Sequence, residues 1–288
     1  GDARVATVTL GRIDPKLTTE QARALGVKQK VSEYVQEFPY AAYRVQNIGT
    51  AAKYIDGTLL LPGQTFSMND TIKERTAENG YTKGFVIGEG GIFKLAEGGG
   101  VSTATTTMFN AAWFAGLELT EHRAHSIWIP DRYKPGREAT VAWGSFDMRF
   151  TNNTPYGIFI TTEMTDESMT ATMWSTKVYD EVGSSFGEFR NEVPHGTVYS
   201  TDAECHAQNG VDGFTITVKR TLTKDGKVLP AEEYTTTYSP SPTVVCGPDP
   251  SLKPSPSASG SAKPGASGSP KPGSGSATPK PSASASKT

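Results

Sequence analysis

The segment at residues 102–117, STATTTMFNAAWFAGL, constrains the fold more than any other part of the chain. A helix that is apolar on every side is stable only when other elements cover it completely. We therefore predict a helix that ends near Gly116 and lies at the centre of the domain. Its apolar side chains cover most of the helix circumference: Met108, Phe109, Ala111, Ala112, Trp113 and Ala115.

The remaining sequence predicts mostly short strands. They are separated by turn signals at intervals of about ten residues, a spacing typical of antiparallel β structure. The fold class that we predict is α+β: β-rich, with a mainly antiparallel sheet packed around one central buried helix. The predicted strands are 3–10, LLLPG (59–63), HSIWIP (125–130), EATVAWG (138–144), DMRFTNN (147–153), YGIFITTEM (156–164) and SMTATMWST (168–176).

Two shorter helices are predicted before the central one. The first begins at Thr18 or Thr19 as N-cap and ends at Gly26. The second has apolar residues at helical spacing from Ile48 to Ile55 and ends before a glycine.

Cys205 and Cys246 are the two cysteines of the chain, and they flank a segment with two predicted strands. A disulfide between them would close a loop of about 40 residues and stabilise the fold by about 4 kcal/mol. The alternative is two unrelated buried thiols. We favour the disulfide, which would give a small linked β unit and would place the protein outside the cytoplasm.

From Ser251 onward the chain contains Ser, Ala, Gly, Pro, Lys and Thr, apart from Leu252. Such a composition cannot bury enough apolar surface to fold, so we predict a disordered tail. The five tail lysines leave a charge of −7 on residues 1–250, since the whole chain carries −2. This balance argues against nucleic acid as a partner. The lysines are either solvated charges or contacts for an anionic polymer.

The N-terminal residues and the distribution of apolar residues indicate where the protein is located. The sequence has no run of 18 apolar residues, so we predict no transmembrane helix. Gly1 is followed by a polar strand-like stretch, and we expect that an upstream export segment has been removed.

Three glycines, Gly98, Gly99 and Gly100, lead directly into the central helix. The first N–H groups of a helix have no partners in the helix and attract anions, and glycines let a ligand approach them closely. The hydroxyls of Ser102 and Thr103 would lie beside such a ligand. The alternative is that the glycines serve close packing and the hydroxyls cap the helix.

Two histidines follow the helix. His122 or His125 could act as a base toward a hydroxyl at the helix start, and Glu138 could orient the imidazole. The spacing matches no zinc motif, so we expect no metal and no cofactor. His195 and His206 lie in polar stretches that offer no evident partner.

Four stretches occur in the order and spacing typical of the VanW family. They are NIGTAAKYIDGTLLLPGQTFSMND (47–70), ERTAENGY (74–81), EGGGVSTATTTMFNAAWFAGLELTEHRAHSIWIP (97–130) and GREATVAWGSFDMRFTNNT (136–154). The chain resembles this family over about residues 44–175. The preceding residues 17–39 resemble the connector that follows repeated wall-associated domains in relatives, which implies a longer exported precursor.

The resemblance implies a bacterial cell-envelope protein, because the family takes its name from an accessory gene of glycopeptide-resistance clusters. Some members are regarded as peptidoglycan L,D-transpeptidases, which form an acyl-enzyme on a cysteine that follows the glycine run. Here Ser102 stands at that position, while His125 and Glu138 match the family's histidine and acidic residue. A serine hydroxyl is far less acidic than a thiol and needs a positioned base.

Further residues are candidates for substrate contact. The glycine run and Thr103 border the expected site, and Arg75 and Arg149 could each bind a carboxylate through two hydrogen bonds. Alternatively, Arg149 pairs with Asp147 or Glu138. The polar Asn110 within the apolar helix is expected to form structural hydrogen bonds.

Four regions follow from these patterns: an N-terminal strand and helical connector (1–43), a VanW-like domain (44–178), a β extension with the disulfide (179–249) and the tail (250–288). Our first hypothesis is an exported protein that binds peptidoglycan stem peptides or precursors. The alternatives are a peptidoglycan acyltransferase with Ser102 as nucleophile and His125 as base, and a structural or adhesive surface module. The last predicts no cleft beside the glycines.

Overall fold

The structure is a computed structural model that describes residues 17–252. The strand predicted at residues 3–10 lies outside the described residues. The tail predicted from residue 251 also lies outside them, apart from its first two residues.

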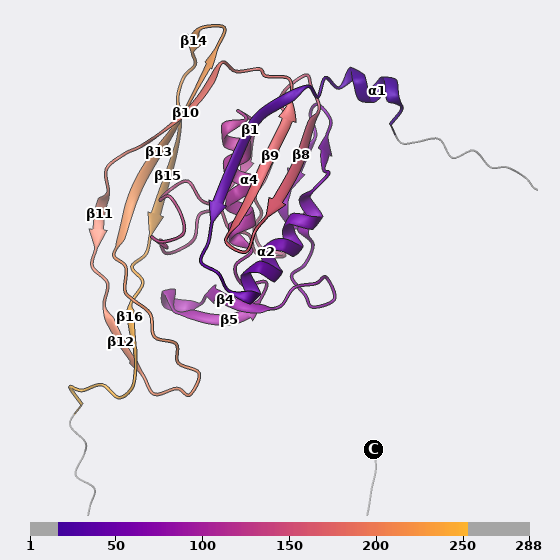
Figure 1. Ribbon diagram of the computed structural model, residues 1–288. Coiled ribbons are helices and arrows are strands. Elements are labelled where there is room, and N and C mark those ends of the chain that lie inside the picture. The colour runs from indigo at the N-terminus through magenta and orange to yellow at the C-terminus, as the bar shows by residue number, and fades with distance from the viewer. Residues whose placement is uncertain (1–16, 253–288) are drawn as a thin grey trace, which may run out of the picture. The chain divides into compact units, whose positions relative to one another are not determined.

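Helix α4 (Ser102–Phe114) is the centre of the fold, and residues 103–113 are all buried. A four-stranded antiparallel sheet covers it, with α2 (Ala42–Ile55) packed on β8 (Figure 1). This arrangement confirms the predicted fold class. The strand order is β1 (Gln29–Glu37), β9 (Ser168–Ser175), β8 (Ile158–Met164) and β2 (Leu59–Leu60).

Local signals explain where the helices begin and end. Thr18 caps α1 (Thr19–Ala24) through a capping box with Gln21. Gly26 and Gly116 follow α1 and α4 with positive φ angles of 66° and 73°, a conformation that glycine adopts without strain.

Smaller sheets lie around this centre. One is a three-stranded sheet, β3 (Thr65–Ser67), β7 (Arg149–Thr151) and β6 (Glu118–Glu121), joined to the short helix α3 (Met68–Ile72). Another is a hairpin of β4 (Lys83–Ile87) and β5 (Phe93–Glu97), whose turn contains the 3-10 helix η1 (Glu89–Gly91).

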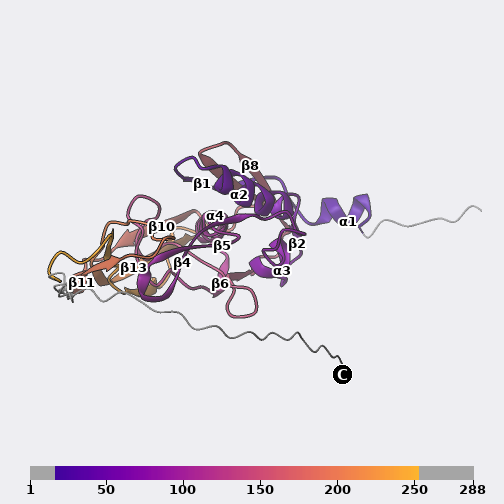
Figure 2. The same ribbon diagram turned by 90° about the horizontal axis from the view of Figure 1, so that it is seen from below.

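The C-terminal strands form an extension beside the part of the fold that contains α4 (Figure 2). The buried guanidinium of Arg220 on β13 donates hydrogen bonds to the carbonyls of Trp113 and Leu117 and to Glu232 on β15. The predicted disulfide Cys205–Cys246 is confirmed. The strands are β10 (Glu181–Phe186), β11 (Arg190–Val193), β12 (Thr197–Ser200), β13 (Gly213–Lys224), β14 (Lys227–Val228), β15 (Glu232–Tyr238) and β16 (Thr243–Cys246).

Two strand predictions, at 125–130 and 138–144, are wrong. Both segments belong to an irregular loop over residues 122–147. Pro130 and Pro135 carry no N–H group for a ladder. The backbone hydrogen bonds of the loop are single contacts and do not form a ladder. One example runs from Ser239 N to Ser126 O at 2.7 Å. The apolar positions are buried by side-chain packing and not by strand pairing.

The segment that we interpreted as a connector contains a strand of the main sheet. β1 pairs with β9 over its whole length, from Gln29 opposite Ser175 to Glu37 opposite Ser168. No helix within residues 17–252 has both the length and the apolar composition needed to span a membrane.

Candidate functional site

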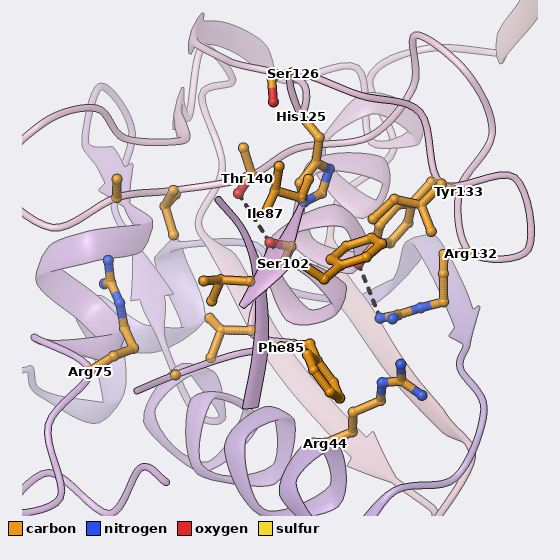
Figure 3. Close-up of a pocket in the computed structure, with 18 of the residues that line it drawn as sticks. Arg44, Arg75, Phe85, Ile87, Ser102, His125, Ser126, Arg132, Tyr133 and Thr140 are labelled. Atoms are coloured by element: carbon orange, nitrogen blue, oxygen red, sulfur yellow. Dashed lines mark hydrogen bonds between the residues drawn. The ribbon is translucent and has the colours of Figure 1, made fainter. Parts of the chain in front are cut away.

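A cleft of about 950 Å³ opens beside the glycine run (Figure 3). Its walls are the β4–β5 hairpin, the start of α4, the loop over residues 122–147 and residues 206–208 of the extension. The hypothesis of a structural or adhesive module predicted no cleft at this position, so the cleft argues against that hypothesis. It joins segments that are far apart in the sequence.

The glycine run acts as a packing joint as well as a wall of the cleft. A Cβ atom on Gly99 would lie 2.2 Å from the carbonyl carbon of Gly84 on β4, so only glycine lets these backbones meet. A Cβ atom on Gly98 would lie 2.4 Å from Cγ of Arg75. Gly98 and Gly100 line the cleft.

Ser102 is the first residue of α4 and lines the cleft with its side chain half-buried. Its Oγ lies 3.0 Å from Oγ1 of Thr140. Among the described residues no hydrogen bond joins Ser102 to His125, although both side chains line the same cleft (Figure 3).

His125 is oriented by a buried carboxylate. The side chain of Glu138 is fully buried, and its Oε2 accepts a hydrogen bond from Nδ1 of His125. The imidazole also stacks on the ring of Tyr133, with centroids 5.2 Å apart. A proton on Nδ1 leaves Nε2 of the neutral ring as an acceptor, which is the state required of a base.

His122 has a different environment. Its Nε2 lies 2.5 Å from the carbonyl oxygen of Glu138 and therefore donates to it, and its ring stacks on Phe109 at 4.2 Å. Burial lowers the pKa of His122 below its ordinary value of 6.5. His122 does not line the cleft.

The other predicted contact residues divide into two groups. Arg75 lines the cleft and donates to Oδ1 of Asn69 at 2.7 Å, and burial lowers its pKa. Thr103 is fully buried and accepts a hydrogen bond from Arg132 at 2.5 Å, so it lies behind the cleft wall. Arg149 forms ion pairs with Asp147 and Glu121 and does not line the cleft.

Asn110 is buried in α4 as expected of a structural residue. Its Nδ2 donates to the carbonyls of Thr106 at 2.9 Å and Arg137 at 3.2 Å. It thereby ties the helix to the loop that carries Glu138.

Several lining residues were not found from the sequence. Arg44, Arg132, Thr140, His206 and Gln208 reach the cleft from separate segments. No local pattern distinguishes them, although the run of charges in DRYKPGRE (131–138) was a signal that this loop has a polar role. Within residues 17–252 no group of three or more His, Cys, Asp or Glu side chains could hold a metal ion.

Comparison with known proteins adds a family relationship. Residues 43–174 match the family model described as VanW like protein. The chain is 35% identical to the uncharacterized protein YoaR of Bacillus subtilis over 169 residues, which is 58% of this chain and 54% of that protein. It is 26% identical to the vancomycin B-type resistance protein VanW of Enterococcus faecalis over 145 residues, or 48% of this chain and 51% of that protein.

The chain thus spans about half the length of these curated relatives. No solved structure shows a significant match. The matched segment contains α2, α4, the glycine run and the loop that carries His125 and Glu138. Over residues 43–174, which is somewhat less than half of its length, the chain is therefore similar to the VanW-like family.

Proposed function

We propose that this protein acts outside the cytoplasm and that its VanW-like domain binds peptidoglycan stem peptides or their precursors. The observation that carries the proposal is the cleft beside the glycine run, in which apolar walls from Phe85, Ile87 and Val101 face polar groups from Ser102 and Arg75. A short peptide with apolar side chains and carboxylates fits such a mixture of surfaces.

Two further observations support the location. The Cys205–Cys246 disulfide favours an oxidising compartment. The similarity to a protein named for vancomycin resistance supports a role at the bacterial cell envelope.

The proposal is tested by NMR titration of the ¹⁵N-labelled protein with a synthetic stem pentapeptide. We expect shifts in the amides of residues 98–102 and 123–133, because these segments form the cleft walls. Amides of β14 (Lys227–Val228) provide an internal control, since they do not line the cleft. Shifts confined to other surfaces, or no shifts at millimolar peptide, would contradict the proposal.

A second candidate function is acyl transfer by Ser102, and the Glu138–His125 pair is the observation that favours it. In this reaction Ser102 Oγ attacks the carbonyl carbon of a stem-peptide bond while Nε2 of His125 takes the hydroxyl proton. The C–N bond then breaks, and His125 gives the proton to the leaving amine. An acceptor amine or water then attacks the ester while His125 takes its proton, and His125 passes this proton to Ser102 Oγ as the C–O bond breaks, which restores the serine.

The test is mass spectrometry of tetrapeptide and pentapeptide muropeptides after incubation with the protein or with Ser102→Ala. Cross-linked or trimmed products, or a covalent adduct on Ser102, are expected with the wild type alone. Thr140→Val is the matched control, because it removes the hydroxyl bonded to Ser102 and leaves the nucleophile in place. Muropeptides unchanged by the wild type contradict acyl transfer and leave the binding proposal intact.

A further inference from the structure

Two arginines that the sequence did not single out reach the same end of the cleft. Arg44 extends from the first turn of α2, and Arg132 extends from the loop over residues 122–147 (Figure 3). Arg44 donates to the carbonyl of Pro39 at 2.9 Å. Arg132 donates to Thr103 at 2.5 Å and to the hydroxyl of Tyr133 at 3.2 Å.

Neither guanidinium is neutralised within the described part of the chain. No ion pair joins Arg44 or Arg132 to a carboxylate among residues 17–252. The Nε atoms of both are buried and have no hydrogen-bond partner there. Buried donors without partners are unfavourable, and native proteins keep few of them.

The two charges also act on each other. Burial lowers the pKa of Arg44, and the positive charge of Arg132 lowers it further. Two like charges that lie close together without a counter-ion are destabilising until an anion binds between them. Arg75, another arginine of the cleft, already donates to Asn69 and lies apart from this pair (Figure 3).

We infer that Arg44 and Arg132 form a subsite for a carboxylate group of the bound peptide. The planar guanidinium offers two parallel N–H donors that match the two oxygens of a carboxylate. The inference rests on the proposed function, since it names the group by which a stem peptide is held in the cleft.

The charges around the pair favour a carboxylate over a phosphate. Glu74, Glu97 and Asp131 line the same cleft as the four arginines Arg44, Arg75, Arg123 and Arg132, and no lysine lines it, so the lining carries a net charge of +1. This charge balances a singly charged carboxylate and leaves a doubly charged phosphate only partly neutralised. The aromatic rings of Tyr43 and Phe85 beside Arg44 provide apolar surface for the rest of a peptide.

Calorimetric titration with a lysine-type stem pentapeptide tests the inference. Three forms are compared: one with both carboxylates free and two with a single carboxylate amidated. We expect Arg44→Gln and Arg132→Gln each to weaken binding of the free form about 10- to 100-fold, the range for a charge-assisted hydrogen bond. One of the two amidated peptides should bind the wild type more weakly than the free form by the same factor. Arg44→Gln should not weaken the binding of that amidated peptide any further.

Arg149→Gln is the matched control, because Arg149 is an arginine of the same domain that lies outside the cleft and pairs with Asp147. Its affinity should equal that of the wild type. Thermal melts establish that each variant is folded. Where a glutamine variant does not fold, Arg44→Lys and Arg132→Lys replace it, and several-fold weaker binding is expected because the forked geometry is lost.

Equal binding of all three peptides to the wild type, with no effect of either arginine variant, overturns the inference and leaves the proposed function standing. No binding of any peptide to the wild type contradicts the proposed function and the inference with it. Displacement of the peptide by inorganic phosphate below about 1 mM, lost in Arg44→Gln, overturns the choice of carboxylate.

Discussion

Glu138 holds two histidines in different roles. Its side chain accepts from His125, which faces the cleft, and its backbone carbonyl accepts from His122, which faces the core. One residue thereby fixes the proton positions of both rings. His122 and His125 are three residues apart, yet only one of them is placed to meet a ligand.

His122 predicts a pH dependence of stability. Its pKa is lowered in the folded state, so between about pH 6.5 and that lower pKa the unfolded chain binds more protons. The free energy of unfolding should therefore fall as the pH decreases below 6.5. His122→Phe keeps the stacking on Phe109 and removes the titration. Urea denaturation at pH 7.5 and pH 5 should show a smaller loss of stability in the variant, and equal losses would refute the assignment.

Ser102 predicts the reactivity of an introduced thiol. In Ser102→Cys the sulfur lies at the N-terminus of α4 and in the cleft with His125, both of which stabilise a thiolate. The pH profile of iodoacetamide alkylation should give a thiol pKa below the usual value of about 8.5. Ser126→Cys is the control, because Ser126 is an exposed residue of the same cleft. Identical profiles for the two variants count against a base at this site.

The sequence pointed to the candidate polar groups that match the family motif, but not to the other residues that line the cleft. His125 and Glu138 were found because they lie near a recognisable motif, and Ser102 because it follows the glycines. Arg44 and Arg132 were missed because the fold alone brings them together, from segments that are not adjacent in the sequence. Such pairs have no signature in a single sequence.

At the scale of elements, the glycine run couples α4 to the β4–β5 hairpin. The carbonyl of Gly99 accepts a hydrogen bond from Asn47 on α2, and its Cα lies against Gly84. Three elements therefore meet at one position without side chains between them.

Gly99→Ala is expected to destabilise the protein by about 1–3 kcal/mol, because a clash with the backbone of Gly84 cannot be relieved by a change of rotamer. Gly49→Ala on α2 is the control. A Cβ atom there meets nothing within 4 Å, so this helical substitution should stabilise by about 0.4–1 kcal/mol. Thermal or urea denaturation measures both. A neutral Gly99→Ala would show that the hairpin moves freely.

Elements with strong local patterns were predicted well. The all-round apolar pattern of residues 102–117 identified α4, and capping residues identified α1. The loop over residues 122–147 was misread because its buried side chains imitate the alternation of a strand. β1 was missed because its burial alternates irregularly and its partner β9 lies far along the chain.

At the scale of the whole molecule, the extension helps to form the cleft. His206 and Gln208 line it directly after Cys205. The ring centroids of His206 and Phe85 lie 4.8 Å apart. Gln208 accepts a hydrogen bond from the N–H of Phe93 and donates one to the carbonyl of Gly91, both in the hairpin. Residues outside the family match therefore complete a wall of the site.

Removal of the disulfide should affect stability and binding together. We expect Cys205→Ser with Cys246→Ser to lower the free energy of unfolding by about 4 kcal/mol, the value for a loop of this length. Peptide affinity should also fall, because the wall formed by residues 206–208 becomes less ordered. Urea denaturation and calorimetry measure the two effects. Lower stability with unchanged affinity would show that the extension is not part of the binding site.

The position of α4 in the chain has a kinetic consequence. The carbonyl of Leu117 accepts a hydrogen bond from Arg220, which lies 103 positions further along the chain. The carbonyl of Ala111 accepts a hydrogen bond from Ser32, which lies 79 positions earlier. Such contacts require the closure of large loops, and the chain loses conformational entropy before the contacts form. Chains of this topology therefore fold slowly. A ribosome-bound chain that ends before the extension would display an apolar helix with its last covering strands still missing. We expect chaperones to bind the exposed apolar surface of this nascent chain until synthesis has passed Arg220.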